Sequence, residues 1–225
     1  KTAGVFATDA EAKAAGKDGY LYMEDNAGLR NDFKAGDVHF IDQNNDGKIS
    51  ELDKVVIGDP NPDIYGNIFA TINYKNLTLT MGWNYSLGND VYNYQRSILN
   101  SGSTFYNQQV AEVAHWRYEG QQTDLPRLAY GDPMGNNRFS DRWIEDGSYL
   151  RLKTLNLSYK VPVPGSWTWL QGLTVWAQAN NLLTFTKYLG SDPEFSIGNG
   201  VLYQGIDCGN IAQGRSFQCG VKINL

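Results

Sequence analysis

The chain has 225 residues with a formal net charge of −5, and this acidic balance argues against nucleic acid as a partner. Its mean hydropathy of −0.45 resembles that of a soluble protein, and no run reaches the roughly 18 apolar residues of a transmembrane helix. These two observations do not exclude a transmembrane β-barrel, because the polar residues that face its lumen lower the mean hydropathy of the chain. Lys1 and the residues after it contain neither an initiator Met nor an apolar signal segment, so we expect the chain to begin within a longer protein or after processing.

A calcium-loop pattern occupies residues 42–53. The candidate ligands are Asp42, Asn44, Asp46, the backbone carbonyl of Lys48, and Asp53, at loop positions 1, 3, 5, 7 and 12. Gly47 stands where such loops turn sharply. Residues 38–41 look extended rather than helical, so we expect a bound ion to stiffen an external loop rather than to act in sensing. The alternative is a turn held by its own Asx side chains, without an ion.

Five segments alternate apolar and polar side chains with a period of two, which is typical of strands with two different faces. They are residues 68–74, 77–86, 155–161, 173–183 and 217–225. Each is near the 9 to 11 or so residues that a tilted strand needs to cross a bilayer. Two connections are short, at 74–77 and 161–172, whereas the loops at 88–147 and 184–214 and the leader before residue 65 are long. This alternation of short turns and long loops is typical of outer-membrane barrels.

The loop at 88–147 is rich in aromatic side chains set among Asn, Gln, Arg and Asp, a mixture that can stack on sugar rings and bond to hydroxyls. We take five of these as candidate substrate-binding residues: Tyr92, Tyr94, Tyr106, Trp116 and Tyr118. The alternative role for these rings is an interfacial girdle or packing of the loop on itself.

Four ordered blocks carry a family resemblance: residues 36–47, 57–62, 140–153 and 180–194. The third, Ser-Asp-Arg-Trp-Ile-Glu-Asp-Gly-Ser-Tyr-Leu-Arg-Leu-Lys, ends the long loop and begins a strand. Together the blocks resemble the C-terminal third of the SusC/RagA-like TonB-dependent transporters, outer-membrane importers of glycans and peptides. The resemblance covers roughly residues 35–225.

The resemblance implies an all-β fold: an antiparallel up-and-down transmembrane barrel of about 22 strands around a plug, of which this chain supplies about the last five. Residues 1–64 would form an external loop region and residues 65–225 the strands and their loops. The implied partners are a SusD-like surface lipoprotein, the plug and other strands of the same transporter, TonB through an N-terminal part, outer-membrane lipid, and an oligosaccharide or peptide substrate. The implied location is the outer membrane, with the long loops outside the cell.

Catalysis has little support in the sequence. His39 and His115 are far apart, and neither lies in a recognisable nucleophile motif, so we do not expect an enzyme. Cys208 and Cys219 could form a disulfide in an oxidising compartment, or Cys219 could simply share the apolar face of its strand. Two further functions remain open on the residues alone. They are a soluble secreted β-sandwich that binds carbohydrate with a structural calcium, and an adhesin-like surface repeat.

Overall fold

The computed structural model describes residues 1–166, 169–194, 198 and 200–225, and it divides into two compact units. Unit 1 comprises residues 1–58 and 92–144, and unit 2 comprises residues 59–91 and 145–225. The sequence placed residues 92–144 with the strands as a long loop. In the structure this segment shares a compact unit with the first 58 residues.

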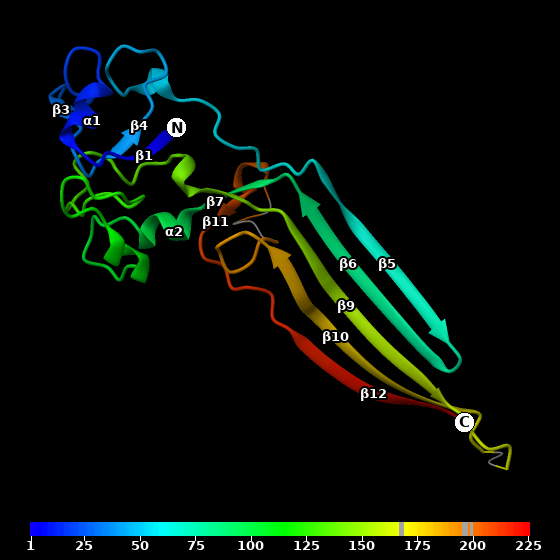
Figure 1. The fold of residues 1–225 in the computed structure, drawn as a ribbon. Coiled ribbons are helices and arrows are strands. Elements are labelled where there is room, and N and C mark those ends of the chain that lie inside the picture. Colours follow the sequence, from blue (N-terminus) through cyan, green and yellow to red (C-terminus); the bar gives the residue numbers. More distant parts are fainter. Residues whose placement is uncertain (167–168, 195–197, 199) are drawn as a thin grey trace. The chain divides into compact units, whose positions relative to one another are not determined.

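Unit 2 is built on one antiparallel sheet of five strands with the order β12-β10-β9-β6-β5 (Figure 1). The strands are β5 (Ile64–Tyr74), β6 (Leu77–Leu87), β9 (Tyr149–Val161), β10 (Gly172–Thr186) and β12 (Ser216–Asn224). All five predicted strands are therefore confirmed. Four of them extend further than the alternating runs indicated, and β9 begins six residues earlier.

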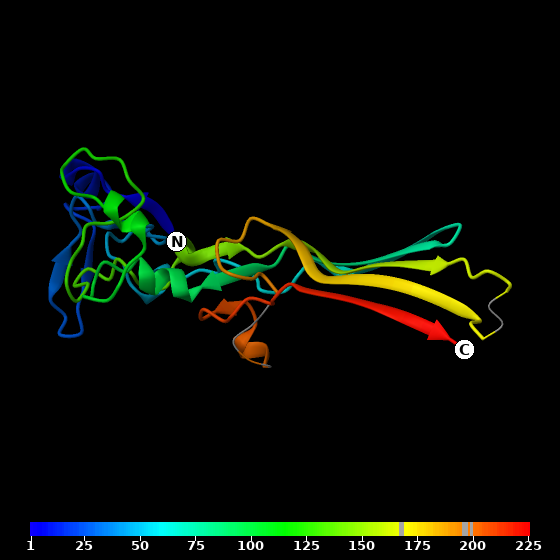
Figure 2. The ribbon, with the colours of Figure 1, turned by 90° about the horizontal axis from the view of Figure 1, so that it is seen from below.

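The short connections gather at one end of this sheet. The β5–β6 turn, the connection from β9 to β10 and the C-terminus lie at that end in both views (Figures 1 and 2). The segments that leave β6 and β10 start from the opposite end, where the sequence has its long loops. This is the arrangement that an up-and-down meander requires.

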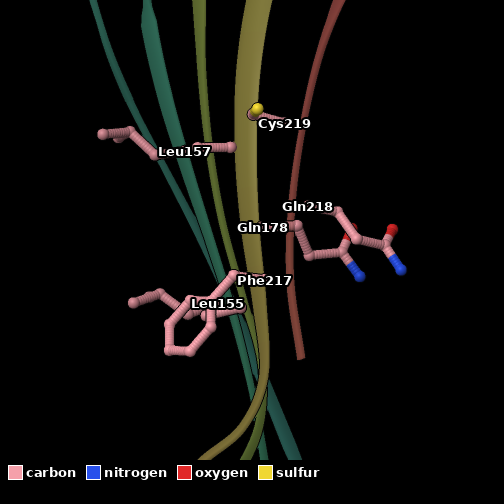
Figure 3. Close-up of a pocket in the computed structure, with 8 residues that line it drawn as sticks. Leu155, Leu157, Gln178, Phe217, Gln218 and Cys219 are labelled. Carbon is pink, nitrogen blue, oxygen red and sulfur yellow. The ribbon is translucent and has the colours of Figure 1, made fainter. Parts of the chain in front are cut away.

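The strand register gathers the apolar side chains on one face. Met81 of β6 is opposite Leu155 of β9, which is opposite Ala179 of β10, which in turn is opposite Phe217 of β12. Figure 3 shows the result: Leu155, Leu157 and Phe217 project from one side of the sheet, and Gln178 and Gln218 project from the other. This apolar face is exposed, with 55% of Ile68 and 72% of Phe217 accessible.

The exposure of the apolar face decides between two of the sequence-based alternatives. A β-sandwich buries the inner faces of two sheets against each other. In the described part of the chain, the other sheets have only two or three short strands, and the apolar face of the large sheet remains uncovered. The described residues of this chain therefore do not form a β-sandwich.

A β-bulge at Lys153 keeps the apolar face continuous. Leu152 and Leu155 are three residues apart, so strict alternation would place them on opposite faces. The register of β9 against β6 shifts between the Gly82–Thr154 and Trp83–Leu152 pairs, and Lys153 is the extra residue. The neighbouring strand β10 has its own irregularity between Asn180 and Leu183, where Asn181 has φ of 52°. The two irregularities lie side by side, so the leucines of β9 stay on one face.

Three glycines of the sheet are covered by aromatic rings from the adjacent strand. The cross-strand pairs are Gly66 with Tyr85, Gly82 with Phe69, and Gly220 with Trp176. A Cβ added at any of the three would lie under 3.0 Å from the ring atoms or hydroxyl of its partner. These glycines are therefore required by packing, and each ring fills the space that a side chain would otherwise take.

Unit 1 has small elements around its own apolar core. They are β1 (Thr2–Val5), α1 (Asp9–Ala14), β2 (Tyr22–Glu24), β3 (Arg30–Asp32), β4 (Val38–Phe40), α2 (Tyr94–Leu99) and the 3-10 helices η1 (Glu51–Asp53), η2 (Val110–Ala114) and η3 (Asp141–Trp143). Phe6, Leu21, Phe33 and Val38 are at most 2% exposed and pack in one cluster to which Met134 also belongs. The core thus joins the first segment of the unit to the second.

The remaining elements are short. A three-stranded sheet has the order β11-β7-β8, formed by β7 (Asp90–Asn93), β8 (Ile144–Asp146) and β11 (Ile206–Asp207), and η4 covers Val201–Tyr203. Across the described ranges, no helix has both the length and the apolar character needed to span a membrane.

Candidate functional site

The calcium-like loop is closed by hydrogen bonds from its own backbone. The Asp42 carboxylate accepts from the N–H groups of Asp46 (3.3 Å) and Gly47 (2.6 Å), and the Asn44 side-chain oxygen accepts from Asp46 N–H at 3.0 Å. Gly47 adopts φ of +85°, a conformation that favours glycine. The carboxylate and amide oxygens of loop positions 1, 3 and 5 are thereby gathered on the inside of one turn.

The twelfth residue of the loop is fixed at its base. Asp53 is 6% exposed, and its two carboxylate oxygens accept from the N–H groups of Gln43 (2.8 Å) and Ser50 (2.7 Å). Asp53 Oδ2 also accepts from the Ser50 hydroxyl at 3.4 Å, so acceptor capacity remains on Oδ1. Ser50 and Asp53 also form the capping box of η1.

The backbone of Lys48 faces the loop interior. Its neighbours pair with β2, because Tyr22 N–H donates to the Gly47 carbonyl and Ile49 N–H donates to the Tyr22 carbonyl. Lys48 N–H donates instead to the Asp46 carboxylate at 2.8 Å. In extended backbone the N–H and C=O of one residue point the same way, so the Lys48 carbonyl is turned toward the loop side chains. These residues offer oxygen atoms of the kind that calcium prefers. Among the described residues, however, no three or more His, Cys, Asp or Glu side chains come together as a metal site.

A buried aspartate holds the two segments of unit 1 together. Asp37 is fully buried and accepts a bidentate pair of hydrogen bonds from Arg127 (2.8 and 3.1 Å) and another from the Asn136 side chain at 3.0 Å. The Asn136 side-chain oxygen accepts from Val38 N–H at 2.8 Å. A fork-shaped guanidinium pair of this kind adds geometric precision as well as energy.

The five candidate substrate-binding aromatics do not form one cluster. The rings of Tyr92 and Tyr94 lie 5.9 Å apart, and Tyr92 also meets Phe139 edge-on at 4.7 Å. Tyr106 and Tyr118 are exposed, at 78% and 67%.

Trp116 has a different environment from the other four candidates. Its ring packs on the backbone of Gly36, and its indole N–H donates to the Ala7 carbonyl at 3.3 Å. The sequence did not point to Tyr130, whose ring stacks on that of Phe105 at 5.0 Å although 25 positions separate them in the chain.

The start of the 140–153 run is tied to the rest of unit 1 by polar contacts. Arg142 donates to the carbonyls of Asn136 (3.0 Å) and Asp124 (3.1 Å), and Asp141 accepts from the Thr2 hydroxyl at 2.6 Å. Burial, together with the charge of Arg96, lowers the pKa of Arg142 to about 10. Arg142 therefore remains charged at neutral pH.

The end of the same run anchors the loop after β10 in unit 2. Arg151 and Asp192 are both 3% exposed and form an ion pair. Glu194 lies 2.9 Å from Arg151 and 2.7 Å from Lys153, the bulge residue. Burial alone would raise the pKa of Asp192, but hydrogen bonds from Arg151 and from the N–H groups of Gln213 and Glu194 hold it below its usual value.

Cys208 and Cys219 are both free and exposed. Cys219 lies on the apolar face beside Leu157 and Phe217 (Figure 3), so of the two sequence-based alternatives the shared face is the one found.

The comparisons with known proteins agree with this architecture. No family model matches the chain. TonB-dependent receptors P3 and P26 of Formosa agariphila are 33% and 36% identical to it over 91% and 89% of the chain. SusC of Bacteroides thetaiotaomicron is 26% identical over 83% of it.

Among solved structures, the RagAB peptide importer in its closed-closed state matches 99% of the chain with a TM-score of 0.67 and 23% identity. A structure of the RagAB peptide transporter gives a TM-score of 0.69 at 21% identity. The chain covers 22% of each of these chains and 17% to 21% of the three curated relatives named above.

An antiparallel sheet with one exposed apolar face and one polar face, similar to RagA, is a segment of a transmembrane β-barrel. The sequence relatives narrow this class: the chain belongs to the SusC/RagA-like TonB-dependent receptors and corresponds to about a fifth of their length.

Proposed function

We propose that this chain is part of an outer-membrane importer that takes up oligosaccharides or peptides under the control of TonB. The observation that carries the proposal is the exposed apolar face of the five-stranded sheet, which lipid would cover. The opposite face is polar and would line the lumen. The sheet leaves β5 and β12 as edges, and these would pair with further strands of the same barrel.

The proposed importer works with a SusD-like surface lipoprotein that covers its external loops. Unit 1, with its aromatic rings and rigid polar network, lies on the outer side in this proposal. TonB would act through a part of the transporter outside this chain. Capture would take place at the external loops, and displacement of the plug would admit the substrate to the lumen.

The test uses the full-length transporter in its native host. We expect it to fractionate with the outer membrane, to require detergent for extraction and to copurify with a surface lipoprotein. Deletion of its gene should abolish growth on one class of oligosaccharide or peptide and leave growth on the corresponding monomer unchanged. Extraction into the aqueous phase without detergent would contradict the membrane assignment, and unimpaired growth on every such substrate would contradict the importer.

We propose further that the 42–53 loop holds a structural calcium ion through Asp42, Asn44, Asp46, the Lys48 carbonyl and Asp53. The spacing of the oxygen-bearing residues and the turn that Asp42 and Asn44 close support this. Asp46→Ala should lower the bound calcium of the full-length transporter by one ion per chain. Asp25→Ala is the matched control. The Asp25 side chain also closes a turn of unit 1, because it accepts hydrogen bonds from the N–H groups of Ala27 and Leu29. Equal calcium content in the two variants would disprove the site.

The substrate contacts that we propose are Tyr92, Tyr94, Tyr106, Trp116 and Tyr118. Tyr106 is the most informative of these, because its exposed ring contributes little to folding. We expect Tyr106→Ala to weaken substrate binding by several-fold, whereas Tyr74→Ala, which removes an exposed tyrosine from the far end of β5, should not. An unchanged dissociation constant for Tyr106→Ala would remove this residue from the site.

A further inference from the structure

The polar face of the five-stranded sheet carries two central rows of uncharged side chains. In each row the strand register sets one residue of each strand directly opposite the next. The first row is Thr71, Thr80, Asn156, Gln178 and Gln218, and the second is Phe69, Gly82, Thr154, Asn180 and Ser216. Figure 3 shows two members of the first row, Gln178 and Gln218, on the side of the sheet opposite Leu155 and Phe217. Hydroxyl and amide groups thus cover the middle of this face.

Hydrogen bonds join the amides of these rows into a chain across β9, β10 and β12. Asn156 Nδ2 donates to Gln178 Oε1 at 3.4 Å, and Gln178 Nε2 donates to Asn180 Oδ1 at 2.9 Å. Asn180 Nδ2 donates in turn to Ser216 Oγ at 3.0 Å. A side-chain amide has two N–H donors and an oxygen with two lone pairs, so each amide of the chain keeps a donor and an acceptor for a ligand. Such a surface matches the hydroxyls of a sugar, because a hydroxyl both donates and accepts.

An exposed aromatic ring lies in the second row. Phe69 of β5 covers Gly82 of β6, and 73% of Phe69 remains exposed. Because glycine has no side chain, the ring lies against the strand and keeps its outer surface open. Phe69 and Asn180 are separated by three strand spacings, which amount to about 14 Å. A ligand that reaches from the ring to Asn180 is therefore longer than a single sugar unit.

Among the described residues, the charged side chains of this face lie outside the two rows. On the long-loop side, Arg151 and Lys153 are paired with carboxylates of the loop after β10. On the other side, Lys160 and Lys222 come four residues after the first row along β9 and β12, which is about 13 Å at the ordinary rise of a strand. That distance exceeds the Debye length of about 8 Å at physiological ionic strength. A charged group bound at the two rows would thus lose hydration without gaining a counter-charge.

We infer that the two rows form a binding subsite for a neutral oligosaccharide on the wall of the lumen. The amide chain would bond to the hydroxyls of the sugar, and one sugar unit would stack on the Phe69 ring. A peptide fits less well, because its terminal charges and its charged side chains would remain uncompensated in the two rows. The inference rests on the proposed importer and narrows its substrate to uncharged oligosaccharides.

Growth of the native host without the gene of the full-length transporter tests the substrate class. The neutral probes are the hexasaccharides of starch, xylan and mannan. The acidic probe is the hexamer of galacturonic acid, and the peptide probe is a tryptic digest of casein. We expect growth to be lost on one of the neutral probes and unchanged on the acidic and peptide probes. Loss on the acidic or the peptide probe overturns the inference and leaves the importer standing, whereas unchanged growth on every probe contradicts the importer and the inference together.

Two substitutions locate the subsite. The measurement is isothermal titration of the full-length transporter in detergent with the neutral probe on which growth was lost. Gln178→Ala should weaken binding by about threefold to tenfold, the effect of one neutral hydrogen bond. Phe69→Ala should weaken it by a similar factor. The matched controls are Gln171→Ala, just before β10, and Phe185→Ala, which lies on the apolar face opposite Leu150; neither should change the affinity.

Unchanged affinity in either Gln178→Ala or Phe69→Ala would overturn the inference. If the rows pack against the plug instead, the same substitutions should admit vancomycin to the cell and leave the affinity unchanged, and this result also overturns it. Compact mobility on semi-native gels shows whether each variant folds. If Phe69→Ala does not fold, Gln178→Ala, which leaves Gly82 covered, decides.

Discussion

Gly220→Ala tests whether the aromatic–glycine pairs hold the sheet together. Gly220 lies opposite Trp176 across β12 and β10, and a Cβ built at Gly220 would lie 2.8 Å from two indole carbons and 2.9 Å from the indole nitrogen. An ordinary contact begins at 3.4 Å, so the rigid ring or the strand must move by about 0.6 Å. Overpacking of this kind costs about 1–3 kcal/mol.

A matched alanine substitution provides the control. At Gly172, the first residue of β10, the nearest atoms to a new Cβ lie at 3.4 and 3.9 Å, so no neighbour has to move. Gly172→Ala should therefore be neutral or stabilising by up to about 1 kcal/mol, since glycine loses the most freedom on folding. The two alanines should thus change stability with opposite sign or very different size.

A double substitution isolates the contact. Because the three atoms nearest to the new Cβ all belong to Trp176, adding Gly220→Ala to a Trp176→Ala background should cost almost nothing. The difference between the two backgrounds measures the coupling. The assay is the urea midpoint at which the full-length barrel loses its compact mobility on semi-native gels. If Gly220→Ala matches Gly172→Ala, or if its cost persists without Trp176, the packing argument is wrong.

Three further predictions concern charged and titratable groups. Burial lowers the pKa of His39, so the unfolded chain takes up a proton more readily than the folded chain. Unit 1 should therefore lose stability as pH falls below about 6.5. In His39→Gln, the stability of unit 1 measured by hydrogen exchange should depend less on pH. Asp192 has a lowered pKa, so its pairing with Arg151 stabilises the fold above the ordinary aspartate pKa. This stabilisation should be lost as pH falls below about 4. Asp192→Asn at neutral pH should make the loop after β10 cleavable by protease, and continued resistance would refute the role of this pair as an anchor. Asp37→Asn should destabilise unit 1 by about 1.5–3 kcal/mol, the worth of a hydrogen bond to a charged group, and the same loss should follow Arg127→Gln in thermal unfolding if the pair acts as one.

The strands could be predicted because their chemistry repeats every two residues. Leu77 to Leu87 reads as one uninterrupted alternation, and the structure keeps it as β6. The early part of β9 could not be predicted in the same way, because the bulge at Lys153 breaks the period between Leu152 and Leu155. A bulge is set by cross-strand pairing, and no local pattern announces it.

Unit 1 was harder to predict for a related reason. Its core joins Phe6 and Val38 to Met134, and its buried polar network joins Asp37 to Arg127, 90 positions away. Contacts at such separations leave no periodicity in the sequence. The calcium-like loop was visible because its candidate ligands are spaced within twelve residues.

The bulge at Lys153 contributes both to the continuous apolar face of the sheet and to the anchor of the loop after β10. Continuity of the apolar face requires one extra residue in β9, since Leu150 and Leu152 must share a side with Leu155. The extra residue is a lysine, whose ammonium reaches Glu194 and the Gln213 side chain at 2.7 and 2.8 Å. The extra residue in β9 thus keeps the apolar face continuous and also supplies a cation to the contacts that anchor the loop after β10. Bulges twist a strand and redirect its side chains. The sequence leucine–arginine–leucine–lysine can therefore place its leucines on the apolar face and its cations at the loop anchor.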